Sequence, residues 1–260
     1  MDVERKYETG LVLSGGVARG YAHIGVLKAL HEWGIKPDVV SGVSAGSIIG
    51  AFYCDGYSPE EIEEILSNKK MMEFIKLSTP KCGFMEMTGL KLTLKKNLRS
   101  KKFDQLQKPL WITATNYCTG ETEYINKGEI LDAIIASSSI PVVFKPHKIN
   151  NNYYIDGGIT NNFPLEPVSE KCKHLIGAFV NPVGIVNQPQ GIFQAAIRSF
   201  QLSISSKISE KKKKMTLYIE PDKLNKYGLF DVSKGKEMIK IGYDKTIKVL
   251  TEKYNTKKYA

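Results

Sequence analysis

Ser44 stands at the centre of a Gly-x-Ser-x-Gly pentapeptide, Gly42-Val43-Ser44-Ala45-Gly46. Between an apolar strand and a helix, this pattern forms a nucleophile elbow that holds the serine hydroxyl clear of the sheet. The two glycines allow a strained backbone and a close approach of strand and helix. Such a serine can attack an acyl carbon, because the helix N-terminus favours the negative charge that develops. The pentapeptide also arises by chance in turns, so it needs support from the rest of the chain.

An acylating serine needs a base, and histidine is the usual one. His23 and His31 precede Ser44 on one predicted helix, where we expect surface roles. His147 lies in a polar edge segment, and His174 begins a buried strand at its amino end, away from the turns. We therefore expect a serine site that does not use histidine.

Asp156 is the better candidate base. It follows the predicted strand Tyr153–Ile155 and precedes Gly157 and Gly158, so it should project from the end of a strand. Asp-Gly is also a common hairpin turn, but Asn150-Asn151-Asn152 already supplies a turn just upstream. A carboxyl with an ordinary pKa of about 4 is a poor base at pH 7. Partial desolvation beside the serine would make it effective, so a Ser–Asp dyad is a reasonable hypothesis that spacing alone does not prove.

A glycine-rich loop, Gly15-Gly16-Val17-Ala18-Arg19-Gly20, follows the apolar strand Leu11–Leu13. Its three glycines allow a tight turn with N–H groups pointing inward at a helix start, which makes an anion site. An oxyanion fits there, and so does the phosphate of a dinucleotide. The dinucleotide interpretation needs a glycine where Val17 stands and an acidic residue at the end of the second strand, whereas Asp38 is at that strand's beginning. We therefore favour the oxyanion.

The elements that must position these residues read as a βαβ unit: strand 11–13, helix Tyr21–Trp33, strand 39–40, elbow and helix Ala45–Tyr53. This order places both glycine turns at the carboxyl ends of adjacent parallel strands. Segment 78–102 has weak periodicity and clustered lysines, and we predict a mobile flap over the site. The remaining predicted elements are a helix capped by Ser58, Pro59 and Glu61, a hairpin over 111–125, helices over 130–138, 191–207 and 234–250, and strands over 153–155, 174–180 and 217–219.

The composition is globular, with 260 residues, 42% apolar and 25% charged. The net charge of +10 suggests an anionic partner, nucleic acid or a phospholipid surface, although solvated faces account for most lysines. The four cysteines lack metal-ligand spacing, so we expect no metal and no cofactor. The N-terminus lacks a signal-like apolar region, and no apolar run approaches the roughly 18 residues of a membrane span. These features predict a cytoplasmic protein that can visit a membrane surface.

Three motifs together, Ser14–Leu27, Gly42–Gly46 and Asp156–Gly158, resemble the signatures of patatin-like phospholipases in their order and separation. The segments 103–120, 136–144 and 156–164 are similar to the family as well, and the likeness covers most of residues 8–185. The resemblance implies a three-layer α/β/α sandwich with a mostly parallel central sheet. We expect one domain over residues 1–260, which 186–260 completes.

The resemblance also implies a role for each matching residue. Ser44 is the nucleophile and Asp156 the base, Gly42 and Gly46 shape the elbow, and Gly157 and Gly158 shape the turn of the aspartate. The oxyanion hole and substrate contacts fall to Gly15, Gly16, Val17, Arg19, Gly20 and Ala45, with Arg19 at the family's basic position. The sequence departs from the family at Val17, where many members have a glycine, and at Val142, where a small residue is common.

The implied activity is hydrolysis of lipid acyl esters, of the phospholipase A or lysophospholipase type, through an acyl-enzyme on Ser44. The expected substrate is a phospholipid or lysophospholipid, and nucleic acid is not expected as a partner. Lysine-rich segments 95–102 and 211–214 are candidate contacts for anionic headgroups. Two alternatives stay open: an acyltransferase or thioesterase on the same dyad, and a non-catalytic lipid-binding regulatory module.

Overall fold

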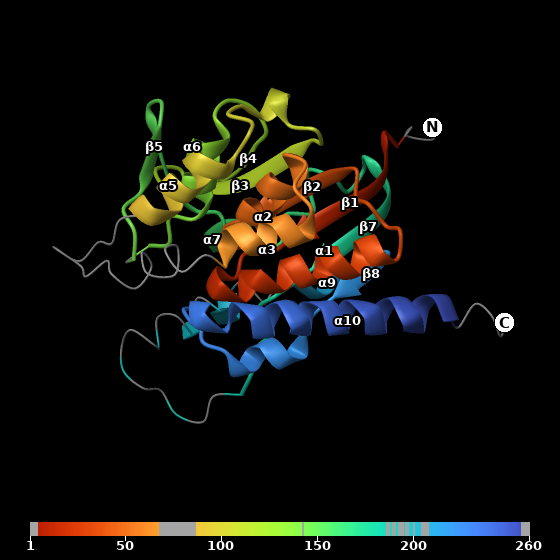
Figure 1. The fold of residues 1–260 in the computed structure, drawn as a ribbon. Helices are drawn as coiled ribbons and strands as arrows, with labels where there is room; N and C mark the ends of the chain where they lie inside the picture. The colour runs from red at the N-terminus through yellow and green to blue at the C-terminus, as the bar shows by residue number, and fades with distance from the viewer. Residues whose placement is uncertain are drawn as a thin grey trace.

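The fold is described from a computed structural model. It describes residues 5–67, 87–141, 143–185 and 208–255, and single residues or short runs between 188 and 203. Within these residues an eight-stranded sheet has the order β5-β6-β3-β2-β1-β7-β8, with β4 also paired to β3 (Figure 1). The strands are β1 Tyr7–Leu13, β2 Val39–Val43, β3 Leu110–Asn116, β4 Thr122–Ile125, β5 His147–Ile149, β6 Asn152–Asp156, β7 Cys172–Ala178 and β8 Leu217–Ile219.

Helices cover both faces of the sheet. They are α1 Ala22–Glu32, α2 Ala45–Cys54, α3 Pro59–Leu66, α5 Thr88–Asn97, α6 Ile130–Ser137, α7 Gly158–Asn161, α9 Ile208–Lys212 and α10 Gly235–Asn255, with short 3-10 turns η1 Val17–Tyr21, η2 Phe103–Gln105, η3 Asp222–Lys226 and η4 Val232–Lys234. Because side chains alternate along a strand, Leu11 and Leu13 join the core beneath α1, α2 and α10, whereas Val12 packs with Phe163 and Phe179 on the opposite face. The expected three-layer α/β arrangement is confirmed.

The parallel part of the sheet contains the predicted βαβ unit. β1 pairs in parallel with β2 and β7, β2 with β3, and β7 with β8. All five residues of β2 are buried, as expected for a strand covered on both faces. The capping box of α3 is present, with the Glu61 N–H donating to the Ser58 hydroxyl.

The far edge of the sheet is antiparallel. β3 pairs antiparallel with both β4 and β6, and β6 forms a hairpin with β5 around Asn150, whose φ is 53°. The dipeptide Asp156-Gly157 is not a hairpin turn, because it leads from β6 into α7. Asp156 does end its strand, as predicted, but β6 runs in the opposite direction to β2 and β3.

Two predicted segments fall partly outside the described residues. In 78–102, residues 78–86 are outside them, and Thr88–Asn97 forms α5, whose Leu94 is buried in the core. In 191–207, the described positions are too scattered to test the predicted helix, and Val142 is also outside. In the part of the chain that is described, no helix is long and apolar enough to cross a membrane.

Candidate active site

Sheet register brings Ser44 and Asp156 to opposite sides of one strand. β3 lies between β2 and β6, with Val43 opposite Thr113 and Ala114 opposite Asp156. Ser44, the residue after Val43, is therefore level with Ala114 and with Asp156 beyond it. Since neighbouring strands lie about 4.8 Å apart, the two backbones are separated by about 10 Å, which two side chains can bridge.

The elbow holds Ser44 in a strained conformation. Its φ of 51° and ψ of −122° lie outside the regions that residues with a side chain normally occupy. A Cβ at Gly42 would lie 2.6 Å from the Gly46 carbonyl oxygen, and one at Gly46 would lie 2.4 Å from that of Leu13. The spacing Gly-x-Ser-x-Gly is therefore a packing requirement here.

Ser137, at the end of α6, fixes the backbone of the elbow. Its hydroxyl accepts a hydrogen bond of 2.7 Å from the Ser44 N–H and donates one of 2.7 Å to the Thr113 carbonyl. Ser137 is fully buried. Ser137 lies in the family-like segment 136–144, but its residue type and position alone did not indicate this role.

Ser44 and Asp156 line the same cavity, which has a volume of about 20 Å³. This is about the room that one water molecule needs. The other lining residues are Gly15, Gly16, Val17, Ile140, Asn162, Asn181 and Leu229. Of the residues predicted for substrate and oxyanion, the structure thus brings Gly15, Gly16 and Val17 to Ser44 and Asp156.

The environment of Asp156 changes its acidity. The carboxyl is almost completely buried, and this desolvation raises its pKa to about 6. A hydrogen bond of 2.7 Å from the Gly158 N–H and the nearby Ser44 side chain both lower the pKa and offset part of the shift. A carboxyl with this pKa is ionised at pH 7, yet it is a stronger base than an exposed aspartate.

The glycine loop is held through its carbonyl groups. The Gly15 carbonyl accepts a hydrogen bond of 2.5 Å from Asn181, and the Ser14 carbonyl accepts one of 2.8 Å from His23 Nε2. The N–H groups of Gly15, Gly16 and Val17 make no hydrogen bond with the described residues. They remain available to an anion in the cavity.

His23 corrects one expectation. We expected a surface position, but the ring is fully buried, and burial lowers its pKa to about 4. The neutral ring donates to the loop and does not line the cavity. His31, His147 and His174 do not line it either. His147 is paired with Asp132 and His174 with Glu8.

Arg19, Gly20 and Ala45 do not line the cavity, although the resemblance assigned them to it. The buried Arg19 guanidinium donates to the Tyr227 carbonyl through Nε at 3.0 Å and Nη2 at 2.7 Å. A Cβ at Gly20 would lie 2.4 Å from that of Ala45, so this glycine allows the loop to pack against α2. Arg19 and Gly20 thus hold the end of the loop against Tyr227 and Ala45.

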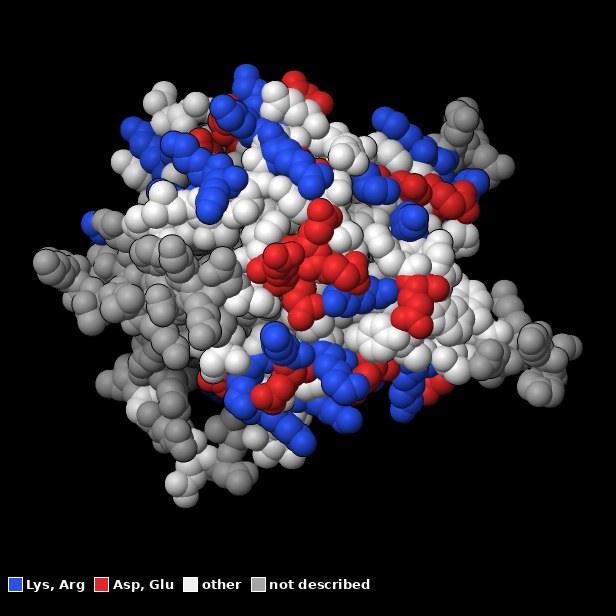
Figure 2. Space-filling model, viewed as in Figure 1, with Lys and Arg blue, Asp and Glu red and all other residues white. Residues whose placement is uncertain are grey.

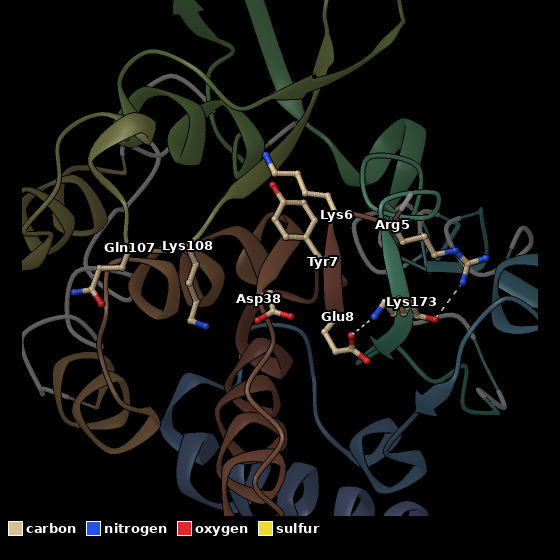
Figure 3. A pocket seen from close by; sticks show the side chains of 8 residues that line it. All are labelled: Arg5, Lys6, Tyr7, Glu8, Asp38, Gln107, Lys108 and Lys173. Atoms are coloured by element: carbon tan, nitrogen blue, oxygen red, sulfur yellow. Dashed lines mark hydrogen bonds and ion pairs between the residues drawn. The ribbon is translucent and has the colours of Figure 1, made fainter. Parts of the chain in front are cut away.

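A second, open depression lies at the amino ends of the parallel strands (Figure 3). Asp38 is part of its lining and accepts a hydrogen bond from the Thr9 N–H. Because Asp38 lies at the opposite end of β2 from Ser44 and the glycine loop, it cannot bind a ribose whose phosphates occupy that loop. The dinucleotide alternative therefore lacks its acidic residue.

Among the described residues, no group of three or more His, Cys, Asp and Glu could hold a metal ion.

The chain is similar to known proteins in sequence and in fold. The sequence profile described as patatin-like phospholipase matches residues 11–169, which contain the glycine loop, the elbow and Asp156. The chain therefore belongs to the patatin-like phospholipase family. The crystal structure of VipD from Legionella pneumophila has the same fold, with a TM-score of 0.56 and 16% identity over 95% of this chain and 67% of that chain.

Two relatives are similar at the level of sequence. An uncharacterized NTE family protein of Mycobacterium tuberculosis is 29% identical over 161 residues, which cover 61% of this chain and 45% of the relative. A probable lipid hydrolase of Invertebrate iridescent virus 6 is 31% identical over 185 residues, covering 62% of this chain and 63% of the relative. The chain thus spans less than two thirds of the length of either relative.

Proposed function

We propose that this chain is a serine hydrolase of lipid acyl esters, with Ser44 as nucleophile and Asp156 as base. One observation carries the proposal: the Ser44 hydroxyl, the buried Asp156 carboxyl and a loop with unbonded N–H groups line one cavity. Membership of the patatin-like phospholipase family and the name of the viral relative support a lipid as substrate.

The reaction begins when Ser44 Oγ attacks the carbonyl carbon of the ester. Its proton passes to the Asp156 carboxylate, and the carbonyl oxygen becomes an oxyanion. The N–H groups of Gly15, Gly16 and Val17 stabilise this charge, with the positive end of the α2 dipole beside them. When the intermediate collapses, the proton on Asp156 goes to the departing alkoxide. Water then attacks the acyl-enzyme and loses its proton to Asp156. Asp156 returns this proton to Ser44 Oγ as the bond to the acyl group breaks, which releases the fatty acid and restores the free serine.

We further propose that the substrate is a phospholipid or lysophospholipid on an anionic membrane surface. The charges on the face in Figure 2 are mixed, with acidic side chains gathered over α3, which contains four glutamates. Of the lysine-rich segment 211–214, Lys211 is paired with Glu166 at 2.7 Å. Lys95 and Lys96, exposed in the last turn of α5, and the exposed Lys213 and Lys214 are the candidates for headgroup contact.

Hydrolysis of a short-chain p-nitrophenyl ester tests the dyad. Ser44→Ala and Asp156→Asn should each abolish hydrolysis while the circular dichroism spectrum stays unchanged. Asp132→Asn, which alters a half-exposed carboxyl that pairs with His147, is the matched control and should keep full activity. Wild-type activity in the Ser44→Ala variant would refute the proposal.

Labelling with a fluorophosphonate probe separates an enzyme from a non-catalytic lipid-binding module. The probe forms a covalent bond only with an activated serine, so wild type should be labelled and Ser44→Ala should not. A lipid extract incubated with both proteins then identifies which free fatty acids depend on Ser44. Appearance of a new acyl ester in place of a free fatty acid would indicate a transferase.

A further inference from the structure

Within the described part of the chain, the side-chain amide nitrogen of Asn162 is a buried donor without a hydrogen-bond partner. The residue is only 6% exposed, and its Nδ2 makes no hydrogen bond with the described part of the chain. Buried polar groups in folded proteins are almost always hydrogen-bonded, because an unpaired one loses its hydration without compensation. An unpaired donor beside the proposed catalytic serine is therefore a candidate to donate a hydrogen bond to a bound ligand.

Asn162 is positioned directly beside the proposed nucleophile. It is the C-cap of the short helix α7, which starts two residues after Asp156, and it lines the same cavity. A Cβ built on Gly15 would lie 2.5 Å from Asn162 Oδ1 and 3.2 Å from Ser44 Cβ. Asn162 Oδ1 and Ser44 Cβ thus both lie next to Gly15, at the start of the loop, and Nδ2 belongs to the same terminal amide.

Two neighbouring asparagines show how different this amide is. Asn161 Nδ2 donates to the Tyr124 hydroxyl at 2.9 Å and to Glu166 at 2.7 Å. Asn181, which also lines the cavity, donates to the Gly15 carbonyl at 2.5 Å. Both amides have a structural role, whereas Nδ2 of Asn162 has no such partner among the residues that the structure describes.

We propose that Asn162 is a substrate-contacting residue whose Nδ2 donates a hydrogen bond to the carbonyl oxygen of the ester. This rests on the proposed hydrolase function and adds a side-chain donor to the backbone amides of the loop. As Ser44 Oγ bonds to the carbonyl carbon, the oxygen gains charge and the hydrogen bond strengthens, so the contact favours the transition state over the bound substrate.

The variants Asn162→Leu and Asn162→Ala test this role. The first keeps the approximate size of the side chain and the second removes it. Both should lower kcat about 100- to 1000-fold, as expected for loss of one oxyanion donor, and change KM by less than about threefold. Binding of an alkyl trifluoromethyl ketone, which forms a tetrahedral adduct with the serine, should weaken by the same factor as kcat/KM.

Ser41→Ala is the matched control. Ser41 Oγ is also buried and unpaired within the described chain, but Ser41 lies inside β2 and does not line the cavity. Its removal should leave kcat and inhibitor binding unchanged. Because Asn162→Leu removes an unpaired polar group, neither it nor Ser41→Ala should reduce resistance to urea.

The outcomes separate this inference from the function on which it rests. If wild type hydrolyses the ester, Ser44→Ala does not, and Asn162→Leu keeps wild-type kcat and inhibitor affinity, Asn162 has no contact with the substrate and only this inference fails. If kcat falls in parallel with loss of the folded state, the role is structural and the inference also fails. If wild type and Ser44→Ala are equally inactive, the proposed function fails and this inference with it.

Discussion

The backbone N–H of Ser44 donates a hydrogen bond of 2.7 Å to the hydroxyl of Ser137, and that hydroxyl donates in turn to the Thr113 carbonyl. One side chain thereby ties the elbow after β2 to the neighbouring strand β3. The contact lies directly at Ser44, whose φ of 51° is in the left-handed region.

Ser137→Ala should therefore loosen the elbow. The variant leaves the buried Ser44 N–H without a partner, which costs about 1–3 kcal/mol of unfolding free energy, and kcat should fall because the hydroxyl of Ser44 is less well positioned. Urea denaturation and ester hydrolysis measure the two effects. Ser139→Ala is the control, since the Ser139 hydroxyl bonds only within its own segment, to Ile135. Equal kcat values in the two variants would contradict a positioning role for Ser137.

Asp156→Asn should make the protein more stable at pH 8. Burial raises the pKa of Asp156 to about 6, so between about pH 4 and pH 6 the folded chain binds more protons than the unfolded chain. Stability therefore falls as pH rises through this window, by about 3 kcal/mol in total. The amide cannot ionise, so the variant should exceed wild type by up to that amount at pH 8 and match it near pH 4. Urea denaturation at both pH values measures this. A variant less stable than wild type at pH 8 would show that burial of the ionised Asp156 carboxylate does not destabilise the fold.

The activity should depend on pH in the opposite sense. If Asp156 must be ionised to accept the serine proton, kcat/KM rises about tenfold per pH unit below about pH 6 and is constant above it. A rate profile from pH 4.5 to 8.5 with the short-chain ester measures this. His147→Gln, which changes an imidazole outside the cavity, should give the same profile. A rise centred at pH 4 would mean that Asp156 is not desolvated in the working enzyme.

Val17→Gly should relieve strain and widen the cavity. Val17 has a φ of 49°, which costs a residue with a side chain about 1–2 kcal/mol, and it lines the cavity of about 20 Å³. Glycine keeps the N–H donor and adopts this φ freely, while its greater freedom in the unfolded chain costs about 0.4–1 kcal/mol. Together the two effects give a stability equal to wild type or up to about 1.6 kcal/mol higher. The wider cavity should also allow faster hydrolysis of longer esters.

Val17→Ala distinguishes the two effects. It shortens the side chain but keeps a Cβ in the left-handed conformation, so longer esters should react faster without any gain in stability. Chain-length series for both variants and for wild type measure this. No change with chain length in either variant would mean that Val17 does not limit access to Ser44.

Local spacing was enough to predict several parts of this protein. The βαβ unit, the elbow, the α3 capping box and the β3–β4 hairpin each depend on residues close together in the chain, so their side chains and glycines specify them directly. Ser44 and Asp156 could be singled out for the same reason, since each stands between a predicted strand and glycines. The sequence could not show that β6 runs antiparallel to β3. The direction of a strand relative to its neighbour depends on which strands pair in the folded sheet.

What only the tertiary structure decided are the contacts between distant segments. Arg19 occupies a motif position that suggests substrate binding, yet its guanidinium donates a hydrogen bond to the carbonyl of Tyr227, 208 residues away in the sequence. Asn181 and Leu229 reach the cavity from beyond β7 and from the segment before α10, where the sequence has no catalytic motif. The order of strands in the sheet sets these contacts, and strand order arises from packing of the whole core. The residue types at the centre of the site, Ser44 and Asp156, can therefore be identified from the sequence. The residues that surround and position them are brought together only by the fold.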